Sequence, residues 1–182
     1  MHHMFILENG LPIVVRKAVY NDALFINQLV ARIYGSTDQV LTSLEEFNSS
    51  ITLNAQLSRI KNYSDSRGKL LLVAEIEKKL VGTLDFWDGQ RQRVQHTGEF
   101  GMGVLKEFRD LGIGKCLIDV LLLWATENPI IEKVKLGVFA SNERAIHLYQ
   151  KMGFVEEGRR VAEIKMAEGN YLDVIEMYKN VK

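Results

Sequence analysis

The chain has 182 residues, of which 47% are hydrophobic and 25% are charged, values typical of one medium-sized globular domain. Its 23 basic and 23 acidic side chains give a formal net charge of zero, so the extended basic surface that nucleic-acid binding requires is not expected. A single cysteine, Cys116, excludes an intrachain disulfide, and together with the absence of a signal-peptide pattern it favours a cytoplasmic location. The longest apolar run, 117–125, is interrupted by Asp119 and is too short to span a membrane.

The first half of the chain predicts one strand, two helices and then a group of strands. The run 13–18 is rich in β-branched residues and predicts a strand, and the segment 21–35 follows with apolar positions at helical spacing. Ser43 and Glu46 form a capping box, which predicts a second helix running to about Ile60. Turn-forming residues then precede three β-rich runs that we expect to form an antiparallel meander, at 69–77, 79–87 and 97–105.

The second half predicts two more helices and three more strands. A helix is expected at 113–126, because its hydrophobic residues form a stripe wide enough to be buried on most sides. It is followed by a strand at 133–140, a helix at 142–152 that Gly153 ends as its C′ residue, and closing strands at 154–161 and 171–179. No repeat or linker divides the chain, so we expect residues 1–182 to form a single α+β domain with a mixed sheet.

Two glycines open the helix predicted at 113–126. The order is a strand, then R-x-x-G-x-G with Arg109, Gly112 and Gly114, and then the helix. Glycines there let the backbone bring several N–H groups to one point at a helix N-terminus, which favours a phosphate. The Walker motif would need glycine at 109 and serine or threonine at 116, and no G-x-G-x-x-G occurs. The turn therefore indicates either a pyrophosphate site or a tight strand-to-helix turn without a ligand.

A second pattern lies on the helix predicted at 142–152. Asn142 and Tyr149 are seven residues apart, about two helical turns, so they share one face with Ala145. An amide and a phenol on an otherwise apolar stripe favour a functional site. The plain structural alternative is that Asn142 caps the helix and Tyr149 is an amphipathic core residue.

Together the two patterns resemble the acetyl-CoA-binding core of the GNAT superfamily of N-acetyltransferases: R-x-x-G-x-G opening a helix, then N-x-x-A-x-x-x-Y-x-x-x-G-F about thirty residues later. The resemblance extends to VVRKAVYNDA, to HTGEFGMGVLKEF and to YLDVIEMYK, which is similar to the closing strand of the bacterial branch that acts on small amines or protein N-termini. It covers nearly the whole chain. It implies a central mixed, mostly antiparallel twisted sheet of about seven strands, flanked by about four helices.

The resemblance also implies that acetyl-CoA is the co-substrate and that two neighbouring strands splay apart to admit its pantetheine arm. The backbone of the strand 97–105 would pair with the arm, the amides of 109–115 would hold the pyrophosphate, and the next helix would contact the cofactor. The implied cofactor-binding residues are Met102, Gly103, Val104, Arg109, Asp110, Gly112, Ile113, Gly114, Lys115, Asn142 and Tyr149. The carboxylate of Asp110 is expected to point away from the phosphates.

In this family the amine attacks the thioester directly, without an acyl-enzyme. Tyr149 matches the general acid that protonates the departing thiolate, because a phenol with a pKa of about 10 keeps its proton at neutral pH. Glu99, acting directly or through water, is the first candidate for the base that accepts the amine's proton, and His96 is the second. The two are three residues apart and face opposite sides of an unbulged strand, whereas a bulge would invert the choice. The alternative for Glu99 is a solvated strand residue.

The expected acceptor is a primary amine of a small molecule or a protein N-terminus, with Asp85, Trp87 and Asp88 as candidates to line its pocket. No nucleic-acid, membrane or metal partner is expected, and a homodimer is compatible with the resemblance, since dimers are common in the family. Two alternatives remain: a non-catalytic acyl-CoA-binding or sensing module, against which Tyr149 argues, and a transferase that uses another acyl-CoA donor such as succinyl-CoA.

Overall fold

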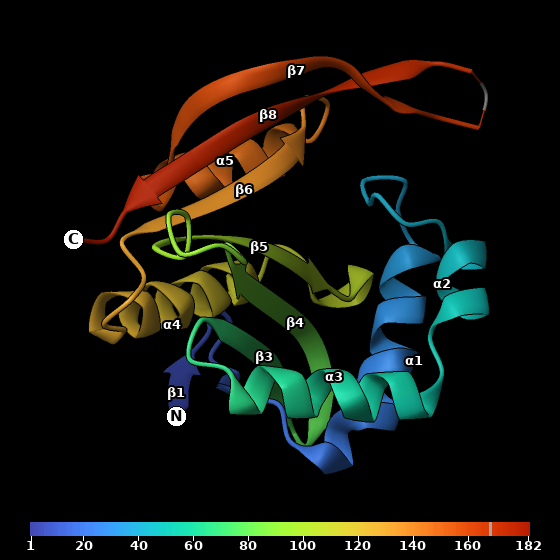
Figure 1. The fold of residues 1–182 in the computed structure, drawn as a ribbon. Helices are drawn as coiled ribbons and strands as arrows, with labels where there is room; N and C mark the ends of the chain where they lie inside the picture. The colour runs from blue at the N-terminus through green and yellow to red at the C-terminus, as the bar shows by residue number, and fades with distance from the viewer. Residues whose placement is uncertain (168) are drawn as a thin grey trace.

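The computed structural model describes residues 1–167 and 169–182, and its strands form one sheet (Figure 1). The order across this eight-stranded sheet is β1-β2-β3-β4-β5-β6-β8-β7. All neighbouring strands are antiparallel except β5 and β6, which run parallel. The strands are β1 (His2–Ile6), β2 (Pro12–Lys17), β3 (Lys69–Ile76), β4 (Lys79–Asp88), β5 (Thr97–Val104), β6 (Lys133–Phe139), β7 (Val155–Lys165) and β8 (Tyr171–Asn180).

Helices cover both faces of the sheet. The α-helices of the described residues are α1 (Ala23–Tyr34), α2 (Leu44–Ser50), α3 (Leu53–Asp65), α4 (Ile113–Glu127) and α5 (Glu143–Lys151), and Tyr20–Asp22 and Lys106–Phe108 form short 3₁₀ helices. The larger core lies under α4 and α5, and it includes Phe86 of β4 and Phe100 of β5. A second core lies between α1, α3 and the opposite face, where Leu71 and Val73 of β3 are buried. Because side chains alternate along a strand, this division assigns each strand residue to one face.

The predicted mixed, mostly antiparallel sheet is confirmed, and two details of the prediction were wrong. The capping box is present, with the Ser43 and Glu46 side chains each 3.1 Å from the other's backbone N–H. The helix does not continue to Ile60, however, because Ile51 is extended and Thr52 starts α3 as a new N-cap. The first strand, β1, was not predicted at all. It pairs with β2 at the sheet edge, which gives eight strands in place of about seven.

The parallel strands β5 and β6 separate after three residue pairs. Thr97–Glu99 pair with Lys133–Lys135. Beyond these pairs, within the described part of the chain, β5 is paired with β4 alone and β6 with β8 alone. Figure 1 shows the two strands diverging from this point. On the α5 side, Phe100 lies edge-on to Tyr149, with 5.9 Å between ring centroids, and 5.8 Å from Phe154. These three rings therefore pack together on the α5 face beside the point where the strands separate.

Two glycines of β5 differ in the space around them, which gives a matched test of the packing. A Cβ on Gly103 would lie 3.0 Å from both Cδ1 and Cγ2 of Ile33 in α1, whereas one on Gly101 would meet only Asp85 Oδ1, at 3.7 Å. We predict that Gly103→Ala lowers the free energy of unfolding by about 1–3 kcal/mol through overpacking. Gly101→Ala should change it by less than about 0.5 kcal/mol. Urea denaturation measures both, and equal effects of the two substitutions would contradict the described packing of α1 on β5.

Candidate active site

Beyond the separation, β5 presents an edge that no strand covers. Met102–Val104 pair with Leu84, Thr83 and Gly82 of β4 on one side only. On the other side, their outward-facing backbone groups have no strand partner among the described residues. An extended ligand can pair with such an edge as a further strand would. The predicted residues Met102, Gly103 and Val104 therefore lie where the arm of a long ligand could be held.

The loop that follows β5 presents the backbone N–H groups of a helix start. Gly112 is the N-cap of α4 with φ of 83°, and Asp110 two residues earlier has φ of 64°, so the chain enters the helix through two left-handed residues. The first bond of the helix joins the N–H of Cys116 to the carbonyl of Gly112. The three preceding amides, those of Ile113, Gly114 and Lys115, therefore have no partner within the helix. Amides in this position favour a phosphate group.

Gly114 brings this helix start against the open edge of β5. A Cβ at Gly114 would lie 3.1 Å from Leu148 Cδ2 of α5 and 3.3 Å from Met102 Cε of β5. Glycine at this position thus permits close packing of α4 against both elements. The open strand edge and the free amides are neighbours for that reason.

The two charged residues of the turn are directed elsewhere. Asp110 is exposed and pairs with Arg144 of α5, with 2.8 Å between Oδ1 and Nε, so its charge is balanced outside the turn. Arg109 is half-buried and donates to the carbonyl of Val104 at 3.3 Å and to the Ser36 hydroxyl at 3.1 Å. Its side chain therefore ties the turn to the end of α1. Lys115 pairs with Asp119 one turn along α4, at 2.7 Å.

Asn142 and Tyr149 lie at the two ends of α5. Asn142 is the N-cap, and its Oδ1 accepts from the N–H of Ala145 at 3.2 Å, as the structural alternative predicted. Its Nδ2 makes no hydrogen bond to any described residue. Tyr149 is buried beside Phe100, the first residue of β5 after the separation, and burial raises the pKa of its phenol. Tyr149 therefore keeps its proton at neutral pH and can act as a donor.

Glu99 lies on the face opposite Phe100, at the last pair that β5 makes with β6. It lines a small hollow of about 90 Å³ together with Trp87 and Lys135. Burial raises the pKa of Glu99, the charge of Glu176 on β8 raises it further, and Lys135 and Arg160 oppose both effects. A half-buried carboxylate with a raised pKa suits a base that must accept a proton.

His96 occupies a different position from Glu99. It precedes β5, and its backbone carbonyl accepts from the N–H groups of Glu132 and Lys133 at the start of β6. It is therefore separated from the open edge at Met102 by six residues of extended chain, about 20 Å. This geometry favours Glu99 over His96 as the candidate base.

The face that carries Glu99 also carries a polar cluster to which α3 contributes. Asp85 Oδ2 lies 2.6 Å from Arg59 Nη2 and 3.3 Å from the Tyr63 hydroxyl. Asp85 was predicted from the sequence as a candidate site residue, whereas Arg59 and Tyr63 were not. Their spacing of four residues, which places both on one side of a helix, was the available signal. Burial and the charge of Asp85 raise the pKa of Tyr63 to about 12, so its hydroxyl stays a donor.

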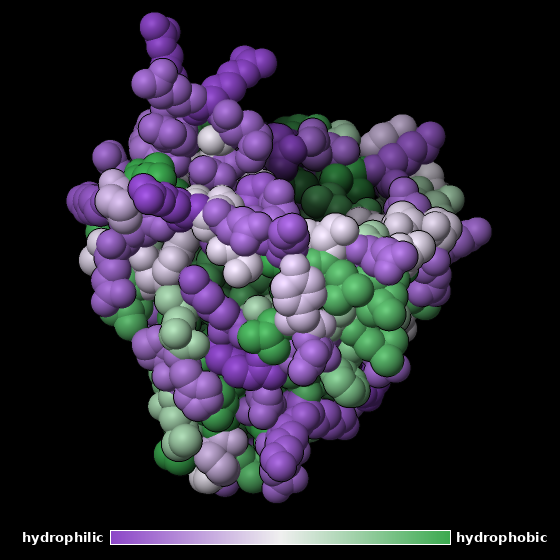
Figure 2. Space-filling view, turned by 60° about the horizontal axis from the view of Figure 1, so that its bottom comes forward, coloured by the Kyte–Doolittle hydropathy of each residue, from purple (hydrophilic) through white to green (hydrophobic). Residues whose placement is uncertain are grey.

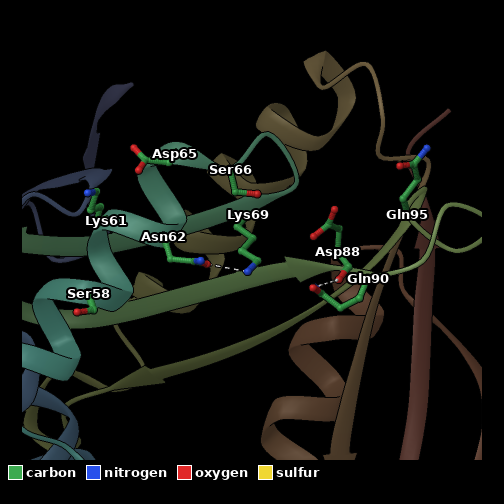
Figure 3. A pocket seen from close by; sticks show the side chains of 10 residues that line it. Ser58, Lys61, Asn62, Asp65, Ser66, Lys69, Asp88, Gln90 and Gln95 are labelled. Atoms are coloured by element: carbon green, nitrogen blue, oxygen red, sulfur yellow. Dashed lines mark hydrogen bonds between the residues drawn. The ribbon is translucent and has the colours of Figure 1, made fainter.

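A polar hollow lies away from the open strand edge. It measures about 590 Å³ and lies between α3 and the loop after β4, as Figure 3 shows. Its lining is polar, and Lys69 donates to Asn62 Oδ1 at 2.7 Å on one side of it, while Asp88 stands between this pair and Gln95. In the space-filling view of Figure 2, hydrophilic and hydrophobic side chains are interspersed over the face in view.

The described residues contain neither a cluster of metal-ligating side chains nor a helix suited to cross a membrane. Within 1–167 and 169–182, no group of three or more histidine, cysteine, aspartate or glutamate side chains is arranged to hold a metal ion. None of the helices described is long and apolar enough to cross a membrane.

An open strand edge beside a glycine-rich helix start is the arrangement expected of a protein that holds a long pantetheine-bearing ligand. Residues 37–154 match the family described as acetyltransferase (GNAT) family, and the chain belongs to this family. It is 30% identical over 118 residues to spermidine N(1)-acetyltransferase of Vibrio cholerae. The matched segment covers 65% of this chain and 66% of that protein, so the match spans just under two thirds of each. It is also 30% identical over 114 residues to the L-amino acid N-acetyltransferase AaaT of Escherichia coli, covering 63% of this chain and 70% of that protein.

Among solved structures, the chain is similar to an acetyltransferase of the GNAT family from Streptococcus pneumoniae. The TM-score is 0.88 at 27% sequence identity, and the match covers 92% of this chain and 99% of that one.

The charge of Glu176 gives a direct test of the electrostatics around Glu99. We predict that Glu176→Gln lowers the pKa of Glu99, because it removes a like charge while Arg160 and Lys135 remain. Carboxyl-detected NMR titration of the two proteins measures the shift. Glu156→Gln, at an exposed position of β7, is the control and should leave the pKa of Glu99 unchanged. An unchanged pKa in Glu176→Gln would contradict the described proximity of Glu176 and Glu99.

Proposed function

We propose that this protein transfers the acetyl group of acetyl-CoA to a primary amine of a small molecule or a protein N-terminus. The observation that carries the proposal is the uncovered edge of β5 at Met102–Val104, which lies between the free amides of α4 and the buried Tyr149. Membership of the acetyltransferase family supports the reaction class. One relative is named for spermidine and the other for L-amino acids, so their names do not select one acceptor.

In this proposal the donor lies across the separation of β5 and β6. The pantetheine arm pairs with the backbone of Met102–Val104, and the pyrophosphate accepts hydrogen bonds from amides between Arg109 and Lys115. Asn142 donates a hydrogen bond to the cofactor through Nδ2, since its Oδ1 already caps α5. The Asp110–Arg144 pair supports this arrangement, because it keeps the carboxylate from adding an unbalanced negative charge beside the phosphates.

The chemistry is a direct displacement at the thioester carbon. The amine nitrogen forms a bond to this carbon, the carbon–sulfur bond breaks, and the sulfur leaves with its electron pair. Glu99 accepts the proton that the amine loses, directly or through water, and Tyr149 gives a proton to the departing thiolate. An N–H of the open β5 edge, aimed at the carbonyl oxygen, stabilises the negative charge that develops there.

A first experiment is to measure release of the CoA thiol from acetyl-CoA in the presence of polyamines, amino acids, aminoglycosides and peptides with free N-termini. Release that depends on one of these classes supports the proposal and identifies the acceptor chemistry. Succinyl-CoA in place of acetyl-CoA tests the donor. Tight binding of acetyl-CoA with no release for any amine would favour a binding or sensing module and contradict the proposed transfer.

Tyr149→Phe tests the general acid within an active enzyme. Loss of the hydroxyl should lower kcat about 100-fold, because general acid catalysis contributes of this order. The dissociation constant of acetyl-CoA should change little, since the ring contacts with Phe100 and Phe154 are retained. Steady-state kinetics and calorimetric titration of acetyl-CoA measure the two effects separately. An unchanged kcat would remove Tyr149 from the mechanism.

A further inference from the structure

The space above Gly101 is open on the face that carries Glu99. Gly101 pairs with Asp85 of β4, and Glu99 lies two residues earlier on the same side of β5. Among the described residues, and apart from its two chain neighbours, a Cβ placed on Gly101 would have Asp85 Oδ1 as its one contact within 4 Å, at 3.7 Å. This opening lies next to Met102, where the uncovered edge of β5 begins.

Asp85 is fixed through one of its two oxygens. Oδ2 accepts from Arg59 at 2.6 Å and from the Tyr63 hydroxyl at 3.3 Å, and Arg59 also lies over the Tyr63 ring, 5.4 Å from its centroid. Oδ1 makes no hydrogen bond with any described residue, and it is the oxygen that faces Gly101. A carboxylate held by two donors on one oxygen therefore presents the other to the open space.

We propose that Asp85 is an acceptor-binding residue whose Oδ1 receives a hydrogen bond from the reacting amine, while Glu99 takes the amine's proton. The inference rests on the proposed acetyl transfer to amines. A primary ammonium group carries three N–H donors, so it can contact both carboxylates at once. Side chains in this diagonal relation on neighbouring strands are about 7 Å apart, which leaves room for one nitrogen between them.

The same arrangement predicts the class of acceptor. A carboxylate on the carbon that bears the reacting amine would lie close to both Asp85 and Glu99 and would be repelled. Arg59 does not offset this, because it is already paired with Asp85, and Lys135 lies beside Glu99 on β6, on the far side of β5 from Asp85. The site is therefore selective for amines without an adjacent carboxylate, such as diamines or amino-terminal amides, against free α-amino acids.

Matched acceptors test the selectivity in the wild-type protein. Alaninamide and alanine differ by a neutral amide in place of the carboxylate, and 1,4-diaminobutane represents acceptors without either group. We expect kcat/KM to be at least about tenfold higher for alaninamide or for the diamine than for alanine. Equal or higher kcat/KM for alanine would overturn the predicted selectivity.

Two variants and one control test the role of Asp85 in acceptor binding. Asp85→Asn should raise the KM for the preferred acceptor about tenfold, with a smaller change in kcat, and should narrow the preference over alanine. Gly101→Ala should also raise this KM, because its methyl group enters the space beside Oδ1. Glu127→Gln is the control: Glu127 is exposed at the end of α4, which packs on the opposite face of the sheet from Asp85, so the KM of this variant should remain that of the wild type.

Replacing Asp85 leaves the Arg59 guanidinium without its ion-pair partner and can destabilise the fold. A further variant therefore separates an effect on folding from an effect on acceptor binding. The double variant Arg59→Met with Asp85→Asn removes both charges and should show the same increase in KM as Asp85→Asn. Calorimetric binding of acetyl-CoA should be unchanged in all four variants and verifies that the fold is intact. If acetyl transfer occurs but KM and selectivity are unaffected in Asp85→Asn and Gly101→Ala, the inference is wrong while the proposed function stands. If the wild type acetylates no amine, the proposed function and the inference about Asp85 are both wrong.

Discussion

The parallel ladder between β5 and β6 ends at the pair formed by Glu99 and Lys135, and the organisation of the site depends on this interruption. Backbone groups in the middle of a sheet are ordinarily paired, and leaving a row of them open has a free-energy cost unless a ligand or water satisfies it. The aromatic cluster of Phe100, Tyr149 and Phe154 packs on the α5 side, beginning at the first residue of β5 after the separation. The structure thus stabilises an edge that can receive an extended ligand.

The interruption also connects the two faces of the sheet, which have different chemistry. The α5 face carries Tyr149, whose burial keeps the phenol protonated. The opposite face carries Glu99 and Asp85, which differ in their surroundings: Glu99 is near Glu176, whereas Asp85 is bound by Arg59 and Tyr63. A reaction centre between the faces would therefore have a proton donor on one side and proton acceptors on the other. Direct attack of an amine on a thioester requires this separation of roles.

Much of the fold could be predicted from local patterns in the sequence. The meander 69–105 follows from its β-rich runs, and α4 follows from its wide apolar stripe and the glycine turn at Gly112. The division of the second predicted helix into α2 and α3 depends on a cap at Thr52, which competes with the continuing helical spacing. The strand β1 is stabilised by antiparallel pairing with the next strand, β2, an interaction that its own residues do not indicate.

The candidate site was predictable only where its residues form a motif along the chain. Gly112, Gly114, Asn142 and Tyr149 do so, and the structure brings their elements together around Met102. The partners of Asp85 were not predictable, because Arg59 is 26 residues away in sequence and reaches Asp85 only when α3 packs on β4. Sequence spacing likewise could not show that Glu176 lies near enough to Glu99 to change its pKa.

The most direct test of the account is amide hydrogen exchange with and without acetyl-CoA. The account predicts that the ligand slows exchange in two segments that are far apart in sequence: Met102–Val104 on the open edge of β5, and Ile113–Lys115 in the first turn of α4. The first strands, β1 and β2, should be unaffected and serve as the internal reference. Binding of acetyl-CoA with no added protection at Met102–Val104 would contradict the claim that the separation of β5 and β6 is the cofactor site.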